Sequence, residues 1–186
     1  MPWSPEQKKQ TRQRILASAA KLFTQQGFDH VGINEVMADA GLTRGAFYSH
    51  FSSKAELYAE SIATAARCAH AQALTQMDDR FDIERVVQGY LSEAHRQGEI
   101  INCPLALLIT DIGQRNQEVR DTYTQIFKGF AGLIKESEAC EADQGDALRK
   151  AVLLVGGMAI SRAINDDQLA TQLLAACRDG VVPHSD

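Results

Sequence analysis

The sequence predicts an all-helical protein, with a small head at residues 1–53, a larger body at residues 54–186 and about nine helices in total. Apolar residues recur at three- and four-residue spacing along almost the whole chain, which is the period of an amphipathic helix. Ser, Thr, Pro and Gly stand where such helices would begin and end. No alternating β-branched runs flank an Asn-Gly or Asp-Gly turn, as they would in a β-hairpin.

The head is predicted to contain three helices. The first begins at Ser4-Pro5, where a capping serine precedes a proline, and ends near Gly27. The apolar positions 33, 36, 37 and 40 predict a second, shorter helix. Gly41 ends that helix, and Thr43 is in position to cap a third one over residues 44–50.

The body is predicted to contain six helices. A long one starts at Lys54, after the capping pair Ser53 and Glu56, and runs into the seventies. The apolar stripes of the others begin near residue 83, at Pro104 and near residues 119, 148 and 169. The helix over residues 148–164 is apolar around almost its whole circumference in the middle, so other helices must cover it on several sides.

Charge is divided unevenly between head and body. The 186 residues are 45% hydrophobic and 23% charged, an ordinary globular composition, with a formal net charge of −5. Residues 1–58 carry seven basic and five acidic side chains, a net charge of +2, and the remainder carries −7. A mildly basic head on an acidic body indicates that the head alone meets a polyanion.

The most informative stretch is residues 33–51, where two short amphipathic helices meet at Ala40-Gly41-Leu42. Gly41 can adopt a positive φ without strain, and the small residues around it let the two helices approach closely. This is the layout of a helix-turn-helix, whose second helix enters the major groove of DNA. The inward face of that second helix would carry Ala46, Phe47 and Phe51.

The run from Gly41 to Leu57 resembles the signature of TetR-family regulators: Gly-Leu-Thr-Arg-Gly-Ala-Phe-Tyr-Ser-His-Phe-Ser-Ser-Lys-Ala-Glu-Leu. In that family a Gly, an aliphatic residue and a Ser or Thr lead into the recognition helix, a Tyr-x-x-Phe follows, and a Lys opens the next helix. The segment from Ile15 to Phe28 is similar to the family's first helix, so the resemblance is dense over residues 12–58. It implies a dimeric regulator that binds a palindromic operator in double-stranded DNA, most often a repressor that a small-molecule inducer releases.

The resemblance also implies which residues contact DNA: Thr43, Arg44, Gly45, Tyr48, Ser49, His50 and Lys54. Arg44 is the candidate for base readout, because a guanidinium can hold guanine O6 and N7 with two hydrogen bonds. Lys54, at a helix N-terminus, is expected to hold a phosphate. Lys8, Lys9 and Arg12 would add positive charge from the first helix.

One position departs from the family pattern. Family members usually place Thr or Ser just before the second helix, where this chain has Val31-Gly32. Glycine is a tolerable N-cap, but the hydroxyl and its phosphate contact are lost.

For the body, the resemblance implies dimerisation through the last two long helices and a small-molecule pocket among the fourth to eighth. The small residues inside the apolar helix over residues 148–164 favour pairing across a twofold axis, although a central helix of a monomeric core would show the same pattern. The expected interface residues are Val152, Val155, Gly156, Ala159, Ile160, Leu169 and Leu173.

The pocket candidates mix aromatic and apolar side chains with a few polar groups: Tyr90, Cys103, Leu107, Asp111, Tyr123, Phe127, Met158 and Arg162. Asp111 and Arg162 could instead form an ion pair. A ligand that prefers a different separation of the two heads would shift the population toward a form that does not bind DNA. The long helix from Lys54 is expected to link the pocket to the head.

Cys103 suggests an alternative function. Asn102-Cys103-Pro104 places a thiol at the start of a predicted helix, where the dipole favours the thiolate. A regulator that senses oxidants or electrophiles through Cys103 would use such a group, whereas a small buried residue at a helix start is the simpler interpretation.

Motifs of other protein classes are missing from the sequence. It has no His-Glu-x-x-His, phosphate loop, Gly-x-Gly-x-x-Gly or Gly-x-Ser-x-Gly, and its cysteines at 68, 103, 140 and 177 lie far apart. We therefore expect no enzyme, metal or cofactor. A helical protein-interaction module remains an alternative, but it would not explain the basic head. No secretory signal or membrane-spanning run is visible, so a cytoplasmic location without membrane contact is expected.

Overall fold

Helices form nearly all of the described chain. The computed structural model describes residues 4–75, 83–99, 103–137 and 143–182, and no strand occurs in these ranges, so the predicted all-helical class is confirmed. The head holds α1 (Pro5–His30), α2 (Ile33–Asp39) and α3 (Arg44–Phe47). The body holds α4 (Lys54–Thr75), α5 (Ile83–Tyr90), α6 (Glu93–Gln97), α7 (Pro104–Leu107), α8 (Ile109–Ile112), α9 (Gln117–Glu136), α10 (Gln144–Ala163) and α11 (Asp167–Val181).

Two predicted helices are each divided in two, so the described ranges contain eleven helices where about nine were expected. Between α5 and α6, the Ser92 side chain accepts a hydrogen bond from the His95 backbone N at 3.2 Å and starts a new helix. Between α7 and α8, Leu108 has φ −111° and ψ 6°, outside the helical region. Both breaks fall inside a continuous apolar stripe, so apolar spacing could not reveal them.

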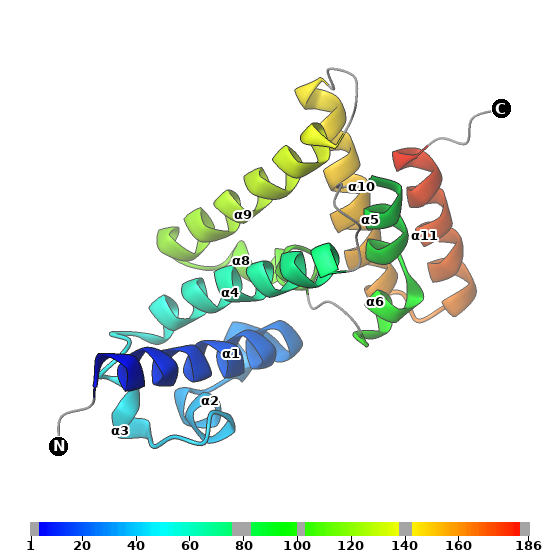
Figure 1. Ribbon diagram of the computed structural model, residues 1–186. Helices are drawn as coiled ribbons and strands as arrows, with labels where there is room; N and C mark the ends of the chain where they lie inside the picture. The colour runs from blue at the N-terminus through cyan, green and yellow to red at the C-terminus, as the bar shows by residue number, and fades with distance from the viewer. Residues whose placement is uncertain (1–3, 76–82, 100–102, 138–142, 183–186) are drawn as a thin grey trace.

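The head is built on α1. This helix packs along α4, and α2 packs against α1 with α3 following it (Figure 1). Gly27 interrupts α1 with φ 77°, close to the predicted end of the first helix. A first cluster of buried apolar residues fills the head and continues beyond residue 53 into α4 and the α8–α9 region: Ile15, Phe23, Met37, Phe47, Phe51, Leu57, Tyr58, Ile62, Leu108, Ile112 and Val119 are among its members.

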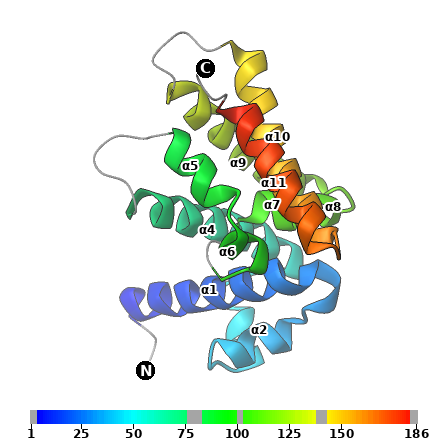
Figure 2. The same cartoon turned by 90° about the vertical axis from the view of Figure 1, so that its right-hand side faces the viewer.

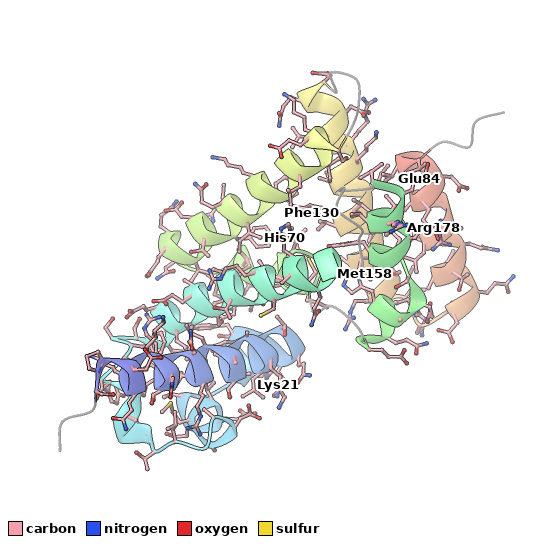
Figure 3. All side chains as sticks on the ribbon, viewed as in Figure 1. Lys21, His70, Glu84, Phe130, Met158 and Arg178 are labelled. Atoms are coloured by element: carbon pink, nitrogen blue, oxygen red, sulfur yellow. The ribbon has the colours of Figure 1, made fainter. Side chains whose placement is uncertain are left out.

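The body is built around the pair α10–α11, which lie side by side (Figure 2). A second buried cluster includes Leu91, Leu105, Ile134, Leu154 and Met158, and Phe130 of α9 packs against it (Figure 3). Gly157 lets α10 approach α11 closely, because a Cβ at this position would lie 2.6 Å from the Cys177 Sγ.

The two clusters are joined through α9 and α7. Tyr123 and Ile126 of α9 pack against both clusters. The short helix α7 contacts α1 and α4 on one side and α9 and α10 on the other. Head and body therefore share a packed boundary.

In the described ranges, no helix combines the length and apolarity that crossing a membrane would require.

Candidate nucleic-acid interface

The turn between α2 and α3 is held by the backbone and by one arginine. The Leu42 backbone N donates to the Met37 carbonyl O at 2.8 Å. Gly41 has φ 65°, the positive value that the sequence predicted. The Arg14 Nη2 of α1 donates to the Ala40 carbonyl O at 2.6 Å, which caps the end of α2 and fixes it to α1. Nothing in the sequence singled out Arg14 for this contact.

The helix α3 has one buried and one exposed side. Phe47 and Phe51 are buried and their ring centroids lie 5.8 Å apart, which anchors α3 to the head. The opposite side presents Thr43, Arg44, Gly45, Tyr48 and Ser49, all of them exposed, while His50 is half-buried. The exposed side therefore offers hydroxyl groups, a guanidinium and, at Gly45, bare backbone.

The ends of α3 differ from the prediction in two ways. The Thr43 side chain makes no capping hydrogen bond to α3, so its hydroxyl is not used inside the helix. The helix ends at Phe47, and a turn over residues 48–50 replaces its predicted last residues. Tyr48 is 60% exposed, with its ring edge against Phe47. A Cβ at Gly45 would meet nothing within 4 Å, so the surface is open there.

Positive charge from α1 stands beside the end of α3. Lys8 and Lys9 are exposed on the first turns of α1. Burial lowers the pKa of His50, and the charges of Lys8 and Arg12 lower it further, which places those charges close to His50. The Arg12 guanidinium lies 4.5 Å from the centroid of the Phe51 ring and forms an ion pair with Glu60 at 2.6 Å. Arg12 thus ties α1 to α4 as well as adding charge.

Lys54 is the first residue of α4, as predicted, and its ammonium lies beside an aromatic ring. Its Nζ lies 4.1 Å from the centroid of the Phe28 ring, and the residue is half-buried. Burial lowers the pKa of Lys54. The predicted cap of α4 differs in detail: Ser53 Oγ accepts from the Glu56 backbone N, but the Glu56 carboxylate accepts from Ser52 rather than from Ser53.

Comparison with known proteins identifies the head. Residues 15–61 match the family model described as bacterial regulatory proteins, tetR family. The head is therefore a TetR-family DNA-binding region. The regulator LmrA of Bacillus subtilis (strain 168), described as HTH-type, is 24% identical over 131 residues, which are 68% of this chain and 70% of LmrA. The HTH-type transcriptional regulator YxaF of the same strain, described as uncharacterized, is 25% identical over 176 residues, covering 89% of this chain and 91% of YxaF.

The likeness to the TetR family extends over the body as a likeness of fold. The crystal structure of a TetR-family transcriptional regulator from Cytophaga hutchinsonii superimposes with a TM-score of 0.76 and covers 97% of this chain and 96% of that one. Sequence identity to it is 16%, so this comparison shows the fold alone.

The pocket residues predicted for the body fall into two groups. Five of them belong to the second buried cluster or pack against it: Tyr90, Cys103, Tyr123, Phe127 and Met158. The Tyr90 hydroxyl donates to the Cys103 Sγ at 3.3 Å, and the Tyr123 hydroxyl donates to the Leu105 carbonyl O at 2.8 Å. Leu107 packs against the first cluster instead, and Asp111 contacts Arg115. Arg162 reaches the first group only through His95, whose ring packs on Tyr90.

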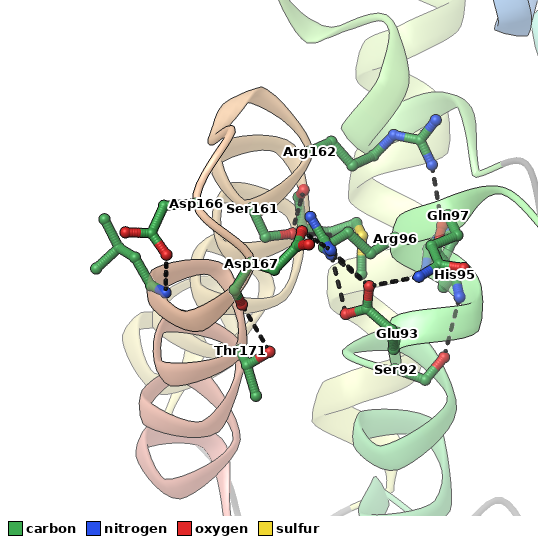
Figure 4. A network of polar contacts seen from close by, with 12 residues as sticks. Ser92, Glu93, His95, Arg96, Gln97, Ser161, Arg162, Asp166, Asp167 and Thr171 are labelled. Carbon is green, nitrogen blue, oxygen red and sulfur yellow. Dashed lines mark hydrogen bonds and ion pairs between the residues drawn. The ribbon is translucent and has the colours of Figure 1, made fainter.

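The suggested ion pair between Asp111 and Arg162 is wrong, because each makes a different contact. Asp111 Oδ1 accepts from Arg115 Nη2 at 2.7 Å, and its other oxygen accepts from the Tyr58 hydroxyl. Arg162 Nη1 donates to the His95 carbonyl O at 2.9 Å (Figure 4). Sequence reasoning missed Arg115, which lies between α8 and α9 and whose partner Asp29 is 86 residues away in the chain.

Arginines also fasten α5 and α6 to the pair α10–α11. Arg96 holds Glu93 at 2.6 Å and Asp167, in the first turn of α11, at 2.7 Å (Figure 4). Arg178 of α11 donates to the Leu91 carbonyl O at 2.6 Å, next to the end of α5. These contacts join α5 and α6 to α10 and α11, the two helices predicted to dimerise.

Cys103 has electrostatics opposite to those predicted. The thiol is 7% exposed, and burial raises its pKa, while the hydrogen bond from Tyr90 acts in the lowering direction. The helix that follows, α7, has only four residues. Backbone hydrogen bonds from Leu105 and Ala106 at the start of α7 also lower the pKa, as predicted, but burial outweighs them, so the net direction is upward. Asn102 lies outside the described residues.

The outer side of α10 and α11 exposes large apolar side chains. Val152 is 61% exposed, Ile160 54% and Leu169 49%. Leu148, which the prediction omitted, is 39% exposed and shares the four-residue spacing of Val152, Gly156 and Ile160. Ala159 and Leu173 are half-buried. Val155 is 3% exposed and lies in the second cluster, so it faces the inside of its own chain.

Proposed function

We propose that this TetR-family transcriptional regulator is a homodimeric repressor that a small molecule releases from a palindromic operator. The observation that carries the proposal is the exposed side of α3. Arg44, Tyr48 and Ser49 stand there opposite a buried phenylalanine anchor, beside the positive charge of Lys8 and Lys9. A rigidly mounted helix with such a surface fits reading of the major groove.

In the proposed complex Arg44 reads a base, and Thr43, Gly45, Tyr48, Ser49 and His50 position the head on bases or the phosphate backbone. Lys8 and Lys9 neutralise phosphates. Lys54 is proposed to hold a phosphate at the start of α4, beside the Phe28 ring that its ammonium contacts. The two heads of a dimer would enter successive major grooves, about 34–36 Å apart.

The base-reading role of Arg44 is tested by comparing operator and random DNA. Arg44→Ala is expected to weaken operator binding by roughly 1–3 kcal/mol and to leave binding to random DNA little changed, because a bidentate contact to guanine carries sequence information. Lys9→Ala should weaken binding to both DNAs equally and reduce the slope of log affinity against log salt by about 0.9.

Arg67→Ala is the matched control, since Arg67 is an exposed arginine of α4 in the body. It should leave both affinities unchanged. An equal loss of affinity for operator and random DNA in Arg44→Ala would contradict its base-reading role.

The proposed inducer binds among the body residues Tyr90, Tyr123, Phe127 and Met158. Aromatic and thioether side chains with one buried and one half-buried tyrosine suit a small molecule that has an apolar body and a few hydrogen-bonding groups. A compound from a thermal-shift screen that stabilises the protein should also dissociate it from the operator. Phe127→Ala should weaken that release without changing the affinity of the ligand-free protein for DNA; release that persists at the same concentration would contradict this site.

A further inference from the structure

Arg115 lies between the head and the body and is nearly buried, with a side chain that is 12% exposed. It follows α8 and precedes α9. Its Nη1 and Nη2 donate to the two carboxylate oxygens of Asp29 at 3.1 and 2.7 Å, a bidentate pair. The same guanidinium donates to Asp111 Oδ1 at 2.7 Å and lies 4.6 Å from the centroid of the Phe28 ring.

Two of the residues that Arg115 contacts, Phe28 and Asp29, belong to the end of α1. Phe28 and Asp29 follow the interruption at Gly27, where φ is 77°, and they precede α2, the first helix of the helix-turn-helix. A side chain at Gly27 would be strained by this φ whatever the space around it. The chain is thus turned at Gly27 so that its next two residues meet Arg115, immediately before it enters the DNA-binding motif.

The group of residues around Arg115 also includes Tyr58 of α4. Asp111 accepts a hydrogen bond from the Tyr58 hydroxyl of α4. The Phe28 ring lies 5.0 Å from the Tyr58 ring, centroid to centroid. We call Phe28, Asp29, Tyr58, Asp111 and Arg115 the Arg115 junction. It joins the end of α1, the long helix α4 and the segment between α8 and α9.

Several contacts set the Arg115 junction apart from an ordinary surface ion pair, which contributes little. Asp29 itself is 66% exposed, but the Arg115 side chain is only 12% exposed, has a second carboxylate partner in Asp111 and stacks on an aromatic ring. The hydrogen bond from Arg115 lowers the pKa of Asp29, so this carboxylate stays ionised at neutral pH.

We propose that Arg115 is a positioning residue for DNA binding, which fixes the orientation of the head on the body through Asp29. The proposal rests on the proposed function, in which two heads must meet one operator with a defined separation. A planar guanidinium fits this task, because it can face two carboxylates in fixed directions, which an ammonium cannot.

The test measures head orientation without DNA. Spin labels are attached at Gln13→Cys of α1 and Lys128→Cys of α9, both exposed positions, in full-length protein with Cys68→Ser and Cys140→Ser. The labelled protein is diluted with unlabelled protein so that distances within one chain dominate. The distribution of label-to-label distances is then measured by pulsed electron paramagnetic resonance for the wild-type junction and for Asp29→Asn, Arg115→Gln and Arg115→Lys.

All three junction variants should broaden the distance distribution or shift it. The matched control is Asp167→Asn, which breaks a body ion pair whose arginine, Arg96, is likewise 12% exposed; it should keep the narrow distribution. Unchanged distributions in the junction variants, or equal broadening in the control, would overturn the proposal.

A DNA measurement separates this inference from the proposed function. The variants should keep wild-type affinity for a single half-site but lose the preference of the wild type for one half-site spacing, since α3 itself is unaltered. A weaker affinity for the single half-site at unchanged spacing preference would overturn the positioning role. If the wild type binds no specific DNA, the proposed function fails, and the distance measurement still decides whether Arg115 orients the head.

Discussion

The exposed apolar side of α10 and α11 makes a quantitative prediction about dimerisation. Full burial of a Val or Ile side chain contributes about 1.5–3 kcal/mol. Slightly more than half of Val152 and of Ile160 is exposed in the single chain. Burial of that exposed part against a partner chain would therefore stabilise the dimer by roughly 1 kcal/mol per side chain. A twofold interface contains each side chain twice, so Val152→Ser or Ile160→Ser should weaken the dimer by about 2 kcal/mol.

A loss of that size corresponds to a rise of about 30-fold in the dimer dissociation constant, and both substitutions together to roughly 10³-fold. Sedimentation over a concentration series measures the constant directly. Ile109→Ser is the control, because Ile109 of α8 is 44% exposed but lies outside α10 and α11. If Val152→Ser and Ile160→Ser raise the dissociation constant no more than Ile109→Ser does, the dimer does not form through this surface.

Three further predictions concern the body. Gly157→Ala should lower the free energy of unfolding by about 1–3 kcal/mol, because its Cβ would lie 2.6 Å from the Cys177 Sγ. A denaturant titration measures this loss, and adding Cys177→Ala to the same chain should recover part of it. Burial lowers the pKa of His95 from 6.5, so the unfolded chain binds a proton that the folded chain excludes. As the pH falls below 6.5, the free energy of unfolding should therefore decrease by up to about 1.4 kcal/mol per pH unit. In His95→Gln this decrease should be less steep. Iodoacetamide should alkylate the exposed Cys68 far faster than Cys103 in the native protein, as mass spectrometry of timed samples can show; equal rates would contradict the buried thiol.

The parts of the fold that follow from local sequence could be predicted. Gly41 needs a positive φ, and the alternation of apolar and polar positions around Phe47 assigns the two sides of α3, so the turn could be located within a few residues. The divisions at Ser92 and Leu108 could not be predicted, because the apolar stripes run through them and the backbone bends to fit the surrounding helices.

Contacts between remote segments were beyond the sequence. Arg115 and Asp29 are 86 residues apart, and no local pattern relates them. The place of Lys54 at the start of α4 could be predicted, but the contact of its ammonium with the Phe28 ring could not, because Phe28 is remote in sequence. The middle of α10 is apolar around its whole circumference, so the sequence could not show that Val155 is buried and Val152 exposed. Only the packing of α10 in the second cluster distinguishes the two residues.

The central claim, that paired α3 helices read a palindromic operator, is tested most directly by selection from a pool of genomic DNA fragments. The full-length protein is incubated with the pool at two salt concentrations, and the bound fragments are sequenced. The expected result is enrichment of a palindrome with half-sites about 10 base pairs apart, which Arg44→Ala weakens and Arg67→Ala leaves intact. Recovery of fragments without a shared sequence, equally for wild type and Arg44→Ala, would contradict it.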